Sequence, residues 1–571
     1  MGNKIIMKKR KYDRRTIVSV IVLITCALFL LWKARYGWVF NDEPFMVSLG
    51  HRMIKGDLLL INEWHKCQTT GCFFLPFILL YTKIVGSTVG LILFCRFVYV
   101  VWWMISGIIV LIRLKQFGWI GLLCTVTFLL FTPLDQMNMT YNSLALSFIL
   151  LFITYFFVKG NAITDCLHGF FLACAILVYP FLLLFFLSYC IAIITVYVKK
   201  VNVPNECKRF FEKGIFIRIS FTAFLIGIII LALIFIGGVE KSFIGIKEVL
   251  QINGSASRSI TSFLKNIIFT LPLQSTIGII VLAVSVFDKN KKHKDIFFII
   301  QAVLCVSSLL WILYDLYSFN CIMTPFTIFG LQCFILTEQR RNYMLLSMWM
   351  TGIIFSIACY LSSDLGMSAM SVGLAVSSIA GMICLSEYCY EMRFFQKGLF
   401  LHRFVVCLIS LIFILQIGGE AYLKIFRSYH DDLFPTLSTV INHGCAKGII
   451  TTKERAEYYE DLYNDVQTIR KLHFANKSVN FLSLSLSPTV YLDLDYDYST
   501  YSVWTYTNNK PDYSTMNKRL NDYYIINPQK KPDIIYIKNS EKEWLNLITC
   551  IDFDRYNSIE LDTGIVFIRE Q

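Results

Sequence analysis

This sequence contains few charged residues. Only 16% of its 571 residues are Asp, Glu, Lys or Arg, 56% are hydrophobic, and the mean hydropathy is +0.59. Soluble domains usually carry about 25% charged residues. Composition therefore excludes a soluble chain and predicts a polytopic membrane protein. The net charge of +14 does not indicate nucleic-acid binding, because the excess lies in short loops between apolar runs, as in membrane proteins.

Several motifs are also missing. The 18 cysteines show no metal-ligand spacing, and most stand singly in apolar runs, where they act as small hydrophobic side chains. No glycine-rich phosphate loop, solenoid-length repeat or low-complexity tract occurs. Cys67 with Cys72, and Cys445 with Cys550, would face outward and could pair, although spacing alone does not fix their connectivity.

Apolar runs predict about thirteen membrane spans. The first, residues 17–32, follows a basic segment that includes Lys4, Lys8 and Arg14, which places the amino terminus in the cytoplasm. The other spans are predicted at 87–112, 117–131, 140–158, 165–180, 181–198, 215–236, 263–287, 295–313, 320–337, 343–361, 370–387 and 403–419.

The loops between these spans alternate in charge. Basic residues occur in every second loop, whereas 132–139, 314–319 and 362–369 contain no Lys or Arg, as the positive-inside rule requires of outer loops. The segment 73–85 has about thirteen residues and contains Pro76, short of the roughly 20 that a span needs. We predict that it lies at the membrane interface, because counting it as a span would invert every later loop.

From residue 420 onward the chain becomes polar. A helix is predicted at 451–472, and strands at 479–486, 489–494 and 532–537. An odd number of spans places this part outside. The predicted fold class is thus an α-helical polytopic membrane protein, with a membrane domain at 1–419 that includes a first outer loop at 33–86, and an extracytoplasmic α/β domain at 420–571.

The first outer loop begins with two adjacent carboxylates, Asp42 and Glu43. Charges near a low-dielectric membrane surface are costly, and their mutual repulsion adds to the cost, which favours a functional role. The alternative is a solvated loop in which Asp42 caps a helix beginning at Pro44. The same loop carries Arg52, His65 and Lys66, each of which could instead be a solvated side chain at the interface.

The order of these features resembles the polytopic glycosyltransferases of the C-type (GT-C) fold. A basic tail, one span, Asp42-Glu43, an amphipathic helix from Pro44 to Lys55, the apolar segment 73–86 and Arg96 near the start of the second span carry the resemblance. The similar families are protein O-mannosyltransferases, bacterial aminoarabinose transferases of lipid A and bacterial cell-surface sugar transferases. The resemblance covers about the first 160 residues and the general layout.

The resemblance implies an enzyme that moves a sugar from a polyprenyl-phosphate donor to an acceptor at the outer face. It assigns Asp42 as the base or orienting group for the acceptor hydroxyl, with Glu43 as its support, because a hydroxyl nucleophile needs a carboxylate to accept its proton. Cationic side chains would hold the donor phosphate. Similar proteins often have Lys-Pro or Pro-Pro where this chain reads 68–72 as Gln-Thr-Thr-Gly-Cys, so that role falls to Arg96, Arg52, His65 or Lys66. Arg96 could instead snorkel to the surface.

The second outer loop supplies Asp135, a further candidate catalytic carboxylate opposite Asp42. Its alternative is an ordinary Asp in a turn after Pro133. Weaker candidates lie at other outer helix ends, namely Tyr314, Asp315, Tyr317 and Asp364. Residues 238–258, with Lys241, Lys247 and Gln251, are predicted to form an amphipathic lid at the membrane surface.

The remaining expectations concern partners and rival functions. Two carboxylates with His65 could hold a divalent metal, but their spacing matches no recognised motif, so no cofactor is certain. The acceptor could be a glycan, a lipid or a protein; no nucleic-acid partner is expected, and a bacterial plasma membrane is the expected location. The alternatives are a transporter or flippase of lipid-linked glycans, a polysaccharide polymerase or ligase, and a non-catalytic assembly scaffold.

Overall fold

The fold is taken from a computed structural model of the chain. It describes residues 14–158, 160–200, 214–252, 261, 265, 273–288, 293–315, 321–337, 343–363, 365–391, 399–472, 478–507 and 510–570. The predicted site residues Tyr317 and Asp364, and most of the basic amino-terminal segment, lie outside these ranges.

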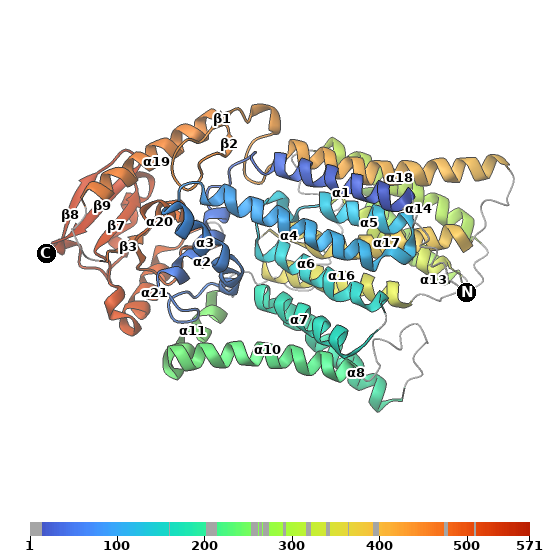
Figure 1. The fold of residues 1–571 in the computed structure, drawn as a ribbon, viewed down its shortest axis with the longest axis horizontal. Helices are drawn as coiled ribbons and strands as arrows, with labels where there is room; N and C mark the ends of the chain where they lie inside the picture. Colours follow the sequence, from blue (N-terminus) through green and yellow to red (C-terminus); the bar gives the residue numbers. More distant parts are fainter. Residues whose placement is uncertain are drawn as a thin grey trace, which may run out of the picture.

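A large helical region occupies one half of the molecule (Figure 1). Its helices are α1 (Arg14–Lys33), α4 (Leu91–Arg113), α5 (Trp119–Leu130), α6 (Tyr141–Thr154), α7 (Ala162–Val178), α8 (Leu183–Val198), α10 (Gly214–Gly237), α13 (Leu273–Phe287), α14 (Lys294–Tyr314), α15 (Thr324–Leu336), α16 (Tyr343–Ser362), α17 (Met367–Glu391) and α18 (Leu399–Phe426). Each predicted span overlaps one of them. Most of 263–272, the first part of the span predicted at 263–287, lies outside the described residues. The last helix continues to Phe426, beyond the predicted end at 419.

Length and composition allow nine helices in the described ranges to cross a membrane. One of the nine is the stretch 68–85, which holds α3 (Gly71–Val85); five further apolar helices are shorter. Figure 1 places α2 (Asp42–Ile54) and α3 at the end of the helical region, beside the carboxy-terminal domain. This position favours the predicted interfacial location of α3. The predicted amphipathic helix at 44–55 is confirmed as α2.

The helical region has a buried centre and an apolar outside. Of the most apolar 18-residue stretch of each helix, 94% is buried in α17, whereas only 6% is buried in α10. Small residues allow α17 to approach its neighbours closely: a Cβ added to Gly330 of α15 would lie 2.0 Å from Gly381 of α17. Helices in lipid gain packing energy from such contacts. The exposed side of α10, rich in Ile and Phe, is suited to lipid.

The carboxy-terminal part of the chain, after α18, forms an α/β domain, as predicted. Its sheet has the strand order β4-β3-β7-β9-β8, with parallel pairing of β3 to β4 and β7 and antiparallel pairing of β9 to β7 and β8. The strands are β3 (Asn480–Ser483), β4 (Asp497–Tyr498), β7 (Ile534–Lys538), β8 (Tyr556–Glu560) and β9 (Gly564–Arg569). Two short pairs, β1 (Thr439–Val440) with β2 (Ile450–Thr451) and β5 (Tyr506–Thr507) with β6 (Lys510–Pro511), lie outside this sheet.

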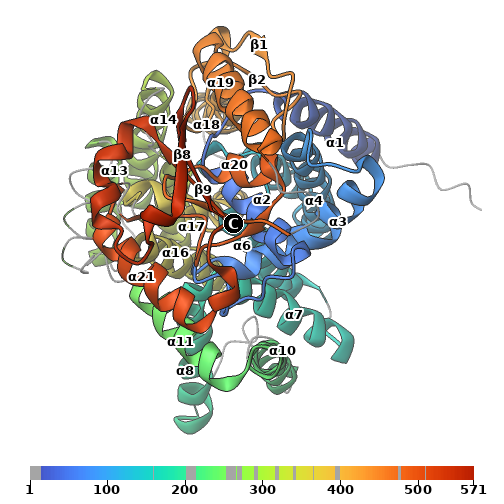
Figure 2. The same ribbon diagram turned by 90° about the vertical axis from the view of Figure 1, so that its left-hand side faces the viewer.

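Three helices pack around the strands. They are α19 (Lys453–Lys471), α20 (Pro488–Leu494) and α21 (Tyr513–Ile526), and Figure 2 looks onto this domain with the helical region behind it. The predicted helix at 451–472 is confirmed as α19, which Thr452 caps by accepting the Arg455 N–H. The predicted strand at 489–494 is wrong, because Pro488 opens a helix there. Proline lacks an N–H, and its fixed φ suits the first helical turn.

Candidate active site at the end of the helical region beside the carboxy-terminal domain

Asp42 lies in the first turn of α2, where the sequence analysis placed it. The cap of α2 is Asn41, which makes no side-chain capping hydrogen bond, so the alternative that Asp42 caps this helix is wrong. The carboxylate is partly buried. Burial, and to a smaller extent the neighbouring Glu43, raises the pKa of Asp42 to about 6, against a hydrogen bond with Gln136 that lowers it. A carboxylate with a pKa just below neutrality is a suitable proton acceptor.

Two other elements meet at Asp42. Gln136 comes from the loop between α5 and α6, and Tyr429 follows the end of α18. Burial and the Asp42 carboxylate both raise the pKa of Tyr429, which keeps this phenol protonated and able to donate a hydrogen bond. Asp42 is thus a partly accessible base among neutral donors.

Glu43 points away into a buried ion pair with Arg96. The Arg96 Nε donates to Glu43 Oε1 at 2.8 Å and Nη2 to Oε2 at 2.5 Å, and both side chains are nearly inaccessible. Arg96 also donates to the carbonyl oxygens of Ala34 and Gly37, at 2.9 and 2.7 Å. The pair therefore joins α2 and α4 to the chain leaving α1. In this structure Arg96 neither snorkels nor lies free to meet a phosphate.

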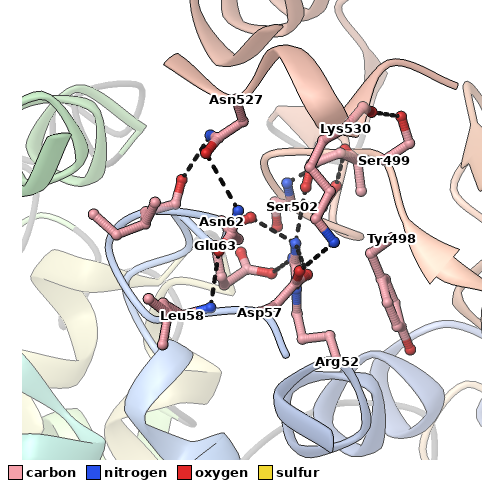
Figure 3. A network of polar contacts seen from close by, with 12 residues as sticks. Arg52, Asp57, Leu58, Asn62, Glu63, Tyr498, Ser499, Ser502, Asn527 and Lys530 are labelled. Atoms are coloured by element: carbon pink, nitrogen blue, oxygen red, sulfur yellow. Dashed lines mark hydrogen bonds and ion pairs between the residues drawn. The ribbon is translucent and has the colours of Figure 1, made fainter. Parts of the chain in front are cut away.

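Arg52 is similarly committed, at the joint between the first outer loop and the carboxy-terminal domain (Figure 3). Its Nε donates to Asp57 at 2.8 Å, its Nη1 donates to Glu63, and its Nη2 donates to the Thr500 carbonyl at 2.9 Å. Lys530 adds a second cation 2.7 Å from Asp57 Oδ1. Two buried carboxylates are thus balanced by two cations. The predicted phosphate ligand Arg52 here positions the loop.

His65 and Lys66 lie in the same loop but differ in charge. Burial, reinforced by the Lys66 charge, lowers the pKa of His65 to about 3, so the imidazole is neutral at physiological pH. Its Nδ1 accepts the Cys67 N–H at 3.1 Å, which leaves the proton on Nε2. Lys66 Nζ donates to the carbonyl of Ser362, at the end of α16, and has no ion pair in the described residues. Of the four predicted phosphate ligands, Lys66 is the one whose charge is not neutralised by a carboxylate.

Asp135 lies in an unusual turn beside Asp42's partner Gln136. Leu134 and Asp135 both have φ of 55°, in the left-handed region that side chains with a Cβ rarely adopt. Such strained conformations gather at functional sites. Asp135 Oδ2 lies 3.4 Å from Nε of Arg427, which follows α18. This geometry differs from the ordinary turn that Pro133 suggested as the alternative.

A cavity of about 50 Å³ opens next to this turn. Charged side chains from two elements line it, namely Asp135, Glu420, Lys424 and Arg427. Lys424 Nζ and Glu420 Oε2 are buried without a hydrogen-bond partner in the described part of the chain. Buried polar atoms usually have partners, so this cavity offers a ligand two polar atoms, one from a lysine and one from a glutamate, that have no partner in the described residues.

Sequence reasoning missed Gln136, Glu420, Lys424 and Arg427. A signal for two of them exists: Glu420 and Lys424 are four residues apart at the outer end of the last span, on one helix face. Their helix was predicted to end at 419, which placed both in the soluble domain.

The other predicted features are placed as follows. Tyr314 is exposed at the end of α14, and Asp315 follows it. The predicted lid contains α11 (Val239–Ile252), which contacts the carboxy-terminal domain through Glu248 and Arg519, 3.9 Å apart. The cysteines of both candidate disulfides, at 67, 72, 445 and 550, are free thiols. Within the described residues, no three His, Cys, Asp or Glu side chains are grouped as metal ligands.

No protein-family model matches this chain, and no curated protein matches it. Solved structures with a similar overall fold include the following two. The archaeal oligosaccharyltransferase AglB from Archaeoglobus fulgidus, in complex with an inhibitory peptide and a dolichol-phosphate, matches 97% of this chain and 74% of its own, at 10% identity and a TM-score of 0.47. ArnT from Cupriavidus metallidurans, in the apo state, matches 96% of this chain and 98% of its own, at 11% identity and a TM-score of 0.43. Similarity at this level does not assign the chain to a family.

Proposed function

We propose that this protein is a GT-C-type membrane glycosyltransferase that transfers a sugar from a polyprenyl-phosphate donor to an acceptor at the outer face of a bacterial plasma membrane. The observation that carries this is Asp42, a partly accessible carboxylate with a raised pKa. The loop of its neighbour Gln136 also lines a cavity in which Lys424 Nζ has no hydrogen-bond partner in the described residues. A base beside a cavity that contains basic side chains is what transfer from a phosphate leaving group requires.

Asp42 serves as the base in this reaction. The acceptor hydroxyl oxygen attacks the anomeric carbon of the donor sugar while its proton passes to the Asp42 carboxylate. The bond from the anomeric carbon to the phosphate oxygen breaks, and its electron pair remains on the polyprenyl phosphate. Gln136 and Tyr429 orient Asp42 and the hydroxyl.

The leaving phosphate is stabilised by cations at the helix ends. Lys424 is the best candidate, because its buried ammonium lacks a hydrogen-bond partner and lines the cavity. Arg427 and Lys66 border the same outer end of the helical region from other elements. Of the residues first predicted for phosphate binding, Arg96 and Arg52 act instead by positioning the loop that carries Asp42, and neutral His65 can contribute only an Nε2–H donor.

Transfer by the purified protein tests this proposal. The protein in lipid nanodiscs would be given a panel of radiolabelled polyprenyl-phosphate sugars with cell-envelope fractions as acceptors. Loss of a general base typically slows a reaction by about 10²–10⁴-fold, so Asp42→Asn should abolish most transfer. The matched control is Asp432→Asn, an exposed aspartate near the same membrane face, which should transfer at the wild-type rate. A folded Asp42→Asn protein with full activity would contradict the assignment.

The same preparation separates the proposal from a flippase. A flippase would move the lipid-linked donor across a vesicle bilayer and leave the sugar on its carrier. Product bound to an acceptor, with release of polyprenyl phosphate, supports transfer; donor translocation without product would replace this function with transport.

A further inference from the structure

A second cavity, of about 210 Å³, lies in the carboxy-terminal domain, away from Asp42. Three basic side chains line it, Lys531, Arg555 and Arg569, together with the rings of Tyr524 and Tyr556. These residues come from α21, the segment before β7, the turn before β8, the first residue of β8 and the end of β9. Figure 1 places β8 and β9 at the end of the molecule opposite to the helical region.

The walls of this pocket are fixed by hydrogen bonds. Tyr556 Oη donates to the Pro532 carbonyl at 2.7 Å, and Tyr524 Oη donates to the Ser499 carbonyl at 2.9 Å. The Arg569 N–H donates to the Asp533 carbonyl at 2.9 Å. The two tyrosine rings and the main chain at Arg569 are therefore held in place before any ligand binds.

The charge of the pocket is mainly positive. Asp552 is the one acidic residue that lines it, and this carboxylate is engaged by Arg555 Nε at 2.8 Å. Lys531 and Arg569 have no ion pair within the described residues. Guanidinium groups bind phosphate and carboxylate in a bidentate manner, and aromatic rings offer apolar faces to the ligand.

The pocket also borders the joint with the first outer loop. Residues 524–532 supply Tyr524 and Lys531 to the pocket, whereas Asn527 and Lys530 of the same segment contact the loop at Ile61 and Asp57. Figure 3 shows Lys530 beside Asp57 and Asn527 beside Asn62. Residues 524–532 therefore contact both a ligand in the pocket and the first outer loop, which carries Asp42.

We propose that this pocket binds an anionic glycan, a saccharide chain that carries phosphate or carboxylate groups. Its distance from the helical region favours an envelope polymer over a lipid headgroup. The idea that this glycan is also the acceptor of the transferred sugar rests on the proposed function. Binding of the glycan to the pocket does not depend on that function.

Binding to the full-length protein in nanodiscs tests the proposal. The probes are a glycerol-phosphate oligomer, an oligogalacturonate, a neutral maltooligosaccharide and inorganic phosphate, measured by calorimetry. At least one of the two anionic oligomers should bind, more weakly as salt is added, and the neutral chain should bind at least tenfold more weakly. Equal binding of neutral and anionic chains, or binding of free phosphate as tight as either oligomer, would overturn the proposal.

Variants locate the site. Arg555→Gln with Arg569→Gln should weaken binding of the anionic oligomer about tenfold or more, because charge-assisted hydrogen bonds are lost. The matched control, Lys453→Gln with Lys542→Gln, removes two exposed cations of the same domain and should bind like the wild type. Equal losses in both double variants would indicate non-specific attraction and refute the site.

A third variant excludes misfolding as the explanation. Asp552→Asn removes the acidic group from the pocket and frees Arg555, so binding should tighten several-fold, a gain that a damaged fold does not produce. Unchanged or weaker binding would count against the proposal. Transfer that fails in every protein while binding follows this pattern would overturn the proposed function and leave the glycan site intact.

Discussion

At the scale of single residues, Asp42 and Glu43 separate into two roles although they are adjacent. Glu43 is inaccessible and paired with Arg96, whereas Asp42 is partly accessible and has a raised pKa. A helix turns about 100° per residue, so neighbours point in different directions. The predicted base, Asp42, and its predicted support, Glu43, therefore lie in different environments: Asp42 is partly accessible, and Glu43 holds α2 against α4.

The pH dependence of transfer should follow Asp42. Its carboxylate must be ionised to accept a proton, so the rate should rise with pH and reach half its maximum near pH 6. The measurement is a pH profile of kcat/KM in nanodiscs between pH 4.5 and 8. A rate that is already constant above about pH 5, as an aspartate with its ordinary pKa near 4 would give, would contradict a raised pKa.

The same shift predicts a stability change. A folded-state pKa raised above its unfolded value makes the ionised form costly in the folded protein, so this cost is absent below about pH 4 and complete above about pH 6. Asp42→Asn should therefore unfold at higher temperature than the wild type at pH 7, by about 1–2 kcal/mol in free energy, and match it at pH 4. Thermal unfolding in detergent at both pH values measures this. Lower stability of the variant at pH 7 would indicate a structural role for Asp42.

Neutralising Glu43 should lower the stability of the protein, in contrast to neutralising Asp42. Glu43→Gln leaves the buried Arg96 cation without its partner and should cost about 3–5 kcal/mol of stability. Adding Arg96→Gln removes that unpaired charge and should recover much of the loss. Thermal unfolding of the single and double variants tests this, and a single variant as stable as the wild type would argue against the buried pair.

At the scale of elements, the first outer loop is held between the membrane helices and the carboxy-terminal domain. The Glu43–Arg96 pair fixes one side of α2 to α4, while Arg52 fixes the end of α2 to residues 57–63 and to Thr500. His51 of the same helix and Lys55, which follows its last residue, contact Asp495 at 2.9 and 2.7 Å. The position of Asp42 therefore depends on both halves of the molecule.

Weakening this joint should loosen the domain. Lys530→Met removes one of the two cations that balance Asp57 and should lower stability by about 1–3 kcal/mol, with faster proteolysis of the segment 427–452. Lys542→Met removes an exposed lysine paired with Glu560 and should change stability by less than about 0.5 kcal/mol. Limited proteolysis with mass spectrometry compares them; identical cleavage in both variants would contradict the joint.

At the scale of the whole molecule, the predicted orientation assigns every loop to one side of the membrane. Lys453 in α19 and Lys115 in the loop after α4 are both exposed. Lys453 is predicted to lie outside the cell and Lys115 in the cytoplasm. In intact cells, with Cys72 and Cys407 replaced by Ser, an impermeant maleimide should label Lys453→Cys and leave Lys115→Cys unlabelled until the cells are opened. The reverse pattern would invert the topology.

The sequence determined the helices and the class of fold by itself. The membrane helices, β3, β7 and α19 could be predicted because they depend on local properties: the length of apolar runs, the charge of loops and the change of composition near residue 420. The strand predicted at 489–494 was wrong because a proline-initiated helix and a strand both suit a short apolar run. Asp42 could be found because it stands near a predicted membrane boundary.

Only the tertiary structure decided which charges are free. The pairing of Glu43 with Arg96, and of Arg52 with Asp57 and Glu63, joins residues whose spacing carries no signal, and it withdraws two predicted phosphate ligands from solvent. Lys424 and Arg427, distant in sequence from the first outer loop, reach the site because α18 returns to the same end of the helical region. Charge balance in a low-dielectric interior depends on which side chains meet, and that is a property of the folded chain.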